Sequence, residues 1–78
     1  MKNVKVLGSG CKRCAATEAL VRDEAKRLGI EIALEHVTDY AAIAGYGVMS
    51  TPGIIVDGTV VHAGGMPKAE DVARWLQA

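Results

Sequence analysis

The chain has 78 residues, half of them hydrophobic, and its nine basic side chains balance nine acidic ones. This length predicts a single domain, residues 1–78, with a modest core that must be built from Val, Ile, Leu and Ala because Phe is absent. The neutral balance argues against a nucleic-acid-binding surface and against a polybasic membrane patch. No apolar run approaches the roughly 20 residues that span a bilayer.

The first half of the chain predicts a strand, a helix and a second strand. Val4 to Leu7 is a short apolar run typical of a buried strand. Residues 11–28 have helical periodicity, and Gly29 fits the C-terminal cap of that helix. Residues 30–37 alternate apolar and polar side chains, which predicts a half-buried strand. The apolar face of the helix should carry Cys14, Val21, Ala25 and Leu28.

The middle of the chain predicts a short helix followed by a hairpin. Thr38 and Asp39 suit the N-cap of a helix over residues 40–44. A loop then leads to a strand over 54–56. Asp57-Gly58 is a strong two-residue hairpin turn, and residues 59–63 form the returning strand.

The end of the chain predicts one more helix. Gly64-Gly65-Met66-Pro67 breaks the strand pattern, and Pro67 suits the region of a first helical turn. The helix should run to about Gln77 and bury Val72, Trp75 and Leu76. The order is therefore β-α-β-α-β-β-α, with the first two strands parallel across a helical connection and the last two antiparallel. This predicts an α/β fold with a mixed four-stranded sheet.

Both cysteines lie in one stretch, Gly8-Ser9-Gly10-Cys11-Lys12-Arg13-Cys14. Two thiols spaced C-x-x-C at a helix start can form a disulfide or share a soft metal. The helix dipole and the charges of Lys12 and Arg13 favour a thiolate, so we expect a lowered pKa for Cys11. Cys14 should lie one turn further in and be more buried.

The cellular setting bears on that chemistry. The N-terminus lacks the apolar core of a signal peptide, so we expect a cytoplasmic protein. In a reducing cytosol, two cysteines at this spacing are more often catalytic or metal-binding than a structural crosslink.

The element order, the C-x-x-C at the first helix and Thr51-Pro52 before the third strand together resemble the thioredoxin and glutaredoxin superfamily. The likeness is greatest to its small thioredoxin-like, redox-active disulfide proteins, and it covers essentially the whole chain. It implies a thioredoxin-like fold with helices on both faces of the sheet. It also implies thiol–disulfide oxidoreductase activity through a dithiol/disulfide cycle.

The resemblance implies roles for particular residues. Cys11 would match the attacking cysteine and Cys14 the resolving one. Thr51-Pro52 would match the loop whose cis-proline lies beside the active sulfurs and binds substrate. Gly64-Gly65 resembles the pair by which glutaredoxins admit a glutathione backbone. The implied partners are a disulfide-bearing protein or small-thiol substrate and a thiol or reductase electron donor, with no cofactor and no metal.

The sequence departs from the best-known family motifs. Gly10 replaces the aromatic residue of Trp-Cys-Gly-Pro-Cys, and Lys12-Arg13 replaces Gly-Pro. Three alternatives therefore stay open: a glutathione-dependent reductase, a carrier of Cu(I), Zn or Hg(II), and a redox-sensing binding module. Ser9 and the terminal helix count against the metal carrier, because small metal chaperones resemble Gly-Met-x-Cys-x-x-Cys and end in a strand.

Overall fold

The computed structural model describes residues 1–8 and 12–78. The helices and strands follow the order β-α-β-α-β-β-α that the sequence predicts. They are β1 (Lys2–Leu7), α1 (Lys12–Leu28), β2 (Ile32–Val37), α2 (Tyr40–Gly45), β3 (Gly53–Val56), β4 (Thr59–Ala63) and α3 (Ala69–Gln77). The α/β class and the mixed sheet are confirmed.

The sheet has four strands in the order β2-β1-β3-β4. β1 is parallel to β2 and antiparallel to β3, and β3 and β4 form an antiparallel hairpin. Leu7, the last residue of β1, is opposite Val37 on one side and Gly53 on the other, and Gly53 is opposite Ala63. The residues that follow β1, precede β3 and follow β4 therefore meet at one end of the sheet.

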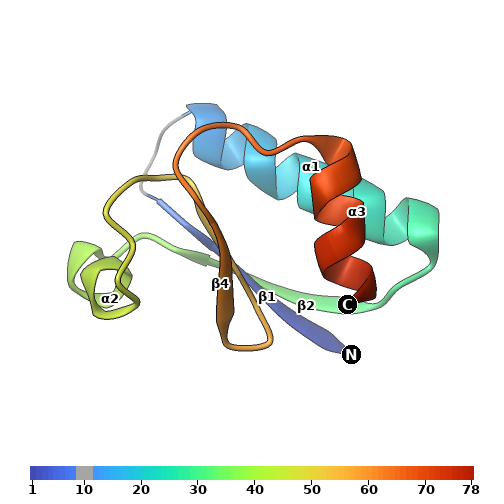
Figure 1. Ribbon diagram of the computed structural model, residues 1–78, viewed down its shortest axis with the longest axis horizontal. Coiled ribbons are helices and arrows are strands. Elements are labelled where there is room, and N and C mark those ends of the chain that lie inside the picture. The colour runs from blue at the N-terminus through green and yellow to red at the C-terminus, as the bar shows by residue number, and fades with distance from the viewer. Residues whose placement is uncertain (9–11) are drawn as a thin grey trace.

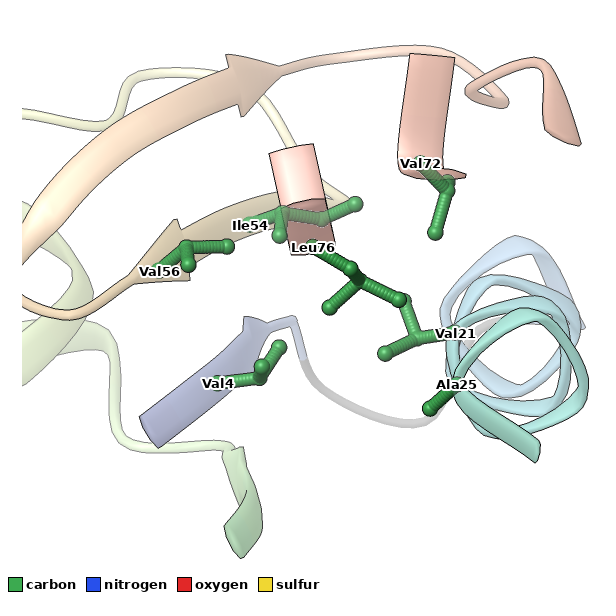
Figure 2. Packing of buried hydrophobic residues seen from close by; sticks show 7 residues of the cluster. All are labelled: Val4, Val21, Ala25, Ile54, Val56, Val72 and Leu76. Atoms are coloured by element: carbon green, nitrogen blue, oxygen red, sulfur yellow. The ribbon is translucent and has the colours of Figure 1, made fainter. Parts of the chain in front are cut away.

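Apolar side chains form a cluster on each face of the sheet. α1 and α3 lie together on one face, and α2 lies at the end of the sheet far from the two chain termini (Figure 1). Figure 2 shows side chains from β1, β3, α1 and α3 pointing toward one another in the larger cluster. Its buried members are Val4, Val21, Ala25, Ile54, Val56, Val72 and Leu76. A smaller cluster contains Leu7, Ile43, Val48 and Ile55.

β3 shows how one short strand serves both clusters. All four of its residues are buried, because one apolar cluster lies on each of its faces. Ile54 and Val56 belong to the larger cluster, whereas Ile55 points the other way and packs with Ile43 of α2. The expectation of helices on both faces therefore agrees with the packing.

The local signals for the turns and caps are confirmed. Asp39 is the N-cap of α2, and its side chain accepts a hydrogen bond of 3.2 Å from the Ala41 N–H. Asp57 and Gly58 have positive φ values of 48° and 84°, as a tight hairpin turn requires. The Asp57 carboxylate also accepts a 2.9 Å hydrogen bond from the Asn3 N–H, which joins the hairpin to β1.

Some predicted boundaries are wrong. β1 begins at Lys2, not Val4, and β2 begins at Ile32, not Ile30. The Ile30 N–H donates to the Ala25 carbonyl at 2.9 Å, so residues 29–30 close the end of α1 instead of extending the strand. α3 begins at Ala69, so Pro67 precedes its first turn.

The charged side chain of Glu24 is largely buried on α1, at 8% exposure. The Arg27 guanidinium donates two hydrogen bonds to its carboxylate, at 3.0 and 2.9 Å. This bidentate pair holds the pKa of Glu24 below its usual value of 4.5, chiefly through the hydrogen bonds from Arg27.

We expect Glu24→Gln to lower the free energy of unfolding at neutral pH. Because the pKa of Glu24 is lower in the folded chain, its contribution is full above the unfolded pKa and is lost as pH falls through the folded pKa. The difference from the parent protein should therefore shrink below about pH 4. Urea titrations at several pH values measure this. The matched control is Asp23→Asn, at the exposed neighbouring position, and an equal difference at acidic and neutral pH would contradict the prediction.

Candidate active site

The site lies where the end of β1 approaches the first turn of α1. Cys14 lies in that turn with 0% exposure, as predicted. The backbone of Gly8, directly after β1, lies so close that a Cβ on Gly8 would overlap the Cys14 sulfur. Gly8 has a φ of 151°, which residues with side chains rarely adopt. Glycine at position 8 therefore allows the strand end to cover the Cys14 thiol.

The loop before β3 reaches the same point. The place that a Cβ on Gly8 would take is 3.3 Å from the Thr51 Cβ and 3.5 Å from the Cys14 Cβ. The Thr51–Pro52 peptide bond is cis, Thr51 is exposed and Pro52 is buried. The strand register explains this proximity. Leu7 is paired with Gly53 in antiparallel strands, so Gly8, which follows Leu7, lies beside the loop that precedes Gly53.

The segment after β4 completes the site. The Gly64 N–H donates to the Pro52 carbonyl at 2.9 Å, and a Cβ on Gly64 would lie 2.9 Å from the Ser50 Cβ. Gly65, by contrast, has nothing within 4 Å of the place where its Cβ would be. Gly64 therefore packs against the proline loop, while Gly65 leaves room for another backbone to approach.

Two methionines border this region. Met66 is about half exposed, and its sulfur lies 3.5 Å from the hydroxyl of Thr17, which donates to it. Thr17 lies one turn after Cys14 on α1 and is fully buried. Met49, two residues before Thr51, is 96% exposed. Met66 thus places a flexible, partly exposed side chain against α1, one turn beyond Cys14.

The sequence-predicted residues are not all described. Cys11 lies outside the described residues. Lys12 and Arg13 are exposed in the first turn of α1, which carries no acidic side chain. The structure brings together Cys14, Thr51, Pro52 and Gly64, and Gly65 follows directly.

Sequence reasoning missed three contributions to this site. It did not find the contact of Gly8 with Cys14, the packing of Ser50 on Gly64, or the hydrogen bond between Thr17 and Met66. The change from apolar to small residues at Leu7-Gly8 was the available signal for the first of these, since a glycine can mark a close backbone approach.

Comparison with known proteins agrees with this geometry. A family model described as a thioredoxin domain matches residues 2–77. The chain belongs to the thioredoxin family. A thioredoxin from Methanocaldococcus jannaschii is 32% identical over 75 residues, which cover 96% of this chain and 86% of that relative. A thioredoxin from Methanothermobacter thermautotrophicus is 29% identical over 76 residues, 97% of this chain and 99% of the relative. Membership of this family supports thiol–disulfide oxidoreductase as the general class of activity.

Two further features were searched over the described part of the chain. Within residues 1–8 and 12–78, no three His, Cys, Asp or Glu side chains gather so that they could hold a metal ion. Among the same residues, no helix combines the length and the apolar character needed to cross a membrane.

We expect Gly8→Ala to destabilise the thioredoxin-like fold by about 1–3 kcal/mol, the usual cost of overpacking a close contact. The added methyl group would collide with the Cys14 sulfur and would also sit on an unfavourable φ. Urea unfolding of the reduced protein measures the change. Gly45→Ala is the matched control, because a Cβ at Gly45 meets nothing within 4 Å, and alanine favours the helix. Equal stability of the Gly8→Ala variant and the parent would contradict the contact.

Proposed function

We propose that this protein reduces disulfides through a Cys11–Cys14 dithiol/disulfide cycle. The observation that carries the proposal is the position of the Cys14 sulfur, buried against Gly8 and beside the Thr51–Pro52 loop. A shielded thiol next to a loop that can receive an extended chain suits the resolving partner of a more accessible cysteine. The family supports the same class of chemistry.

The proposed cycle has two exchange steps. The Cys11 thiolate attacks one sulfur of a substrate disulfide, a mixed disulfide forms, and the other substrate sulfur leaves as a thiolate. Cys14 then loses its proton and attacks the Cys11 sulfur, which forms the Cys11–Cys14 bond and releases the second substrate thiolate. The substrate gains two electrons and, on protonation, two protons. A thiol or a reductase then returns two electrons to the protein.

The neighbouring residues receive roles in this scheme. Lys12 and Arg13 stabilise the attacking thiolate, because they are basic side chains in a first helical turn, where the helix dipole also favours negative charge. Thr51 and Pro52 present a surface for an extended substrate beside Cys14. Gly64 supports that loop through its hydrogen bond to Pro52. The setting we propose is the cytoplasm, with a disulfide-bearing protein or a small thiol compound as substrate.

We expect the two thiols to switch together in a graded series of dithiol redox buffers without metal. Their common midpoint should fall in the range of about −270 to −120 mV that such dithiols span. Quenching with a heavy alkylating agent and reading the mass shift measures the switch. Cys11→Ser should abolish turnover, whereas Cys14→Ser should accumulate mixed disulfides. Thiols that stay reduced throughout, or become protected only when Cu(I) or Zn is added, would contradict the cycle and favour a soft-metal carrier.

A second candidate is a glutathione-dependent reductase. The open space at Gly65, beside the Pro52-bound Gly64, favours it because a glutathione backbone could approach there. We expect Gly65→Val to slow turnover of a glutathionylated peptide at least tenfold more than turnover of a protein disulfide if glutathione binds there, since a tenfold change is what the loss of one or two contacts produces. Gly47→Val, another positive-φ glycine with open space around it, is the matched control. Equal slowing of both substrates would remove this candidate.

A further inference from the structure

The face of the sheet opposite α1 and α3 is covered at one end only. Ile43 of α2 packs there with Leu7 and Ile55, and α2 lies at the end of the sheet far from the two chain termini (Figure 1). Toward the termini, a hollow of about 470 Å³ lies over β1 and its neighbours. Small-molecule sites typically have volumes of about 300–1,000 Å³. The described residues that line this hollow include none of those around Cys14.

Small residues leave the space for this hollow. Asn3 and Ala33 are opposite each other on β1 and β2, and Lys5 and Glu35 are the next opposed pair on the same face. On the other side of β1, a Cβ at Gly58 would meet nothing within 4 Å. The hollow is therefore open between Ala33 and Gly58, and longer charged side chains stand at one side of it.

One side of the hollow presents hydrogen-bond donors. The Lys5 ammonium donates to the Tyr46 hydroxyl at 2.8 Å and lies 5.3 Å from the centre of the Tyr46 ring. The hydrogen bond and the cation–π contact hold the ammonium in place. Because the Tyr46 oxygen accepts this bond, its own O–H can donate to another acceptor, and the ammonium keeps two further N–H groups. Lys5 and Tyr46 together therefore suit a carboxylate.

The neighbouring strand presents the opposite charge. Glu35 is exposed, lines the hollow and is opposite Lys5 in the parallel pairing. Among the ion pairs of residues 1–8 and 12–78, none involves the Glu35 carboxylate. Paired strands lie about 4.8 Å apart, so Glu35 can bind an ammonium group while Lys5 binds a carboxylate of the same small molecule. A simple anion or cation would instead meet one attractive and one repulsive charge.

We propose that the hollow binds a small zwitterion, such as a free amino acid, whose ammonium and carboxylate groups lie on one carbon. The carboxylate accepts from the Lys5 ammonium and the Tyr46 hydroxyl, and the ammonium donates to the Glu35 carboxylate. The rest of the molecule lies over Ala33, toward Gly58. This site is independent of the dithiol cycle, so either can be present without the other.

The test uses the reduced protein with L-leucine as the probe, followed by proton–nitrogen-15 spectra of the backbone amides. We expect saturable shifts at residues 3–5 and 33–35. N-acetyl-leucine lacks the cation and leucine amide lacks the anion. Each should bind at least about tenfold more weakly than leucine, because a charge-assisted hydrogen bond is lost and a like charge is left nearby.

Variants of the hollow separate this site from general surface binding. Lys5→Met and Glu35→Gln should each weaken leucine binding about tenfold. The matched controls are Lys26→Met and Glu70→Gln, at exposed positions on α1 and α3, and both should bind leucine as the parent does. Ala33→Val retains both charges and suits a strand, but it fills the hollow and should abolish the shifts.

Three results would overturn the proposal: no saturable shifts with leucine, equal binding of leucine and N-acetyl-leucine, or leucine binding unchanged in Lys5→Met and Glu35→Gln. Shifts at residues 3–5 and 33–35 that follow protein concentration instead of leucine would also overturn it, because a second copy of the chain would then cover this face. None of these measurements needs a redox partner, so their outcomes are separate from the redox-buffer experiment that tests the cycle.

Discussion

The candidate site depends on the close approach of a strand end to a helix turn. Gly8 lies over the Cys14 sulfur because it carries no side chain, and it follows β1, which pairs with strands on both sides. α1 is held on the same sheet by Val21 and Ala25, which belong to the larger apolar cluster. The position of Cys14 therefore follows from packing far from the thiol, and the site has little freedom to rearrange without loss of core contacts.

The register of the sheet supplies the rest of the site. Leu7, Gly53 and Ala63 lie in a row across β1, β3 and β4. The residues just beyond that row must come together, although they are separated by dozens of positions in the sequence. The hydrogen bond from Gly64 to Pro52 fixes this arrangement on one side, and on the other side a Cβ added at Gly8 would lie only 3.3 Å from the Thr51 Cβ. A slip of one residue in β3 would exchange the faces of its side chains and would separate these loops.

Much of this fold could be predicted from the sequence because its signals are local. The Asp57-Gly58 turn and the Asp39 cap depend on neighbouring residues, and the structure has both. The start of β2 could not be predicted, because the Ile30 N–H donates to the Ala25 carbonyl at the end of α1 and is not paired in the sheet. The apolar character of Ile30 fits a helix end and a strand equally well. The arrangement of Cys14 with Thr51 was implied only by a family resemblance, whereas no sequence pattern indicates the close approach of Gly8 to the Cys14 sulfur.

The contacts of His36 with the Gly8 carbonyl and the Glu18 carboxylate could not be predicted from the sequence for a similar reason. Gly8 follows β1 and Glu18 lies on α1, and neither is at a sequence spacing from His36 that suggests a contact. A weak signal was present, however. Ile32 and Leu34 pack on the larger cluster, and position 36 continues their face of β2 with a polar ring. The apolar face of β2 thus ends in a polar side chain, at the end of the sheet where the buried thiol lies. The sheet supports the core and also supplies a polar contact to the site. In a chain this small, the strand that completes the core also holds the backbone covering the thiol.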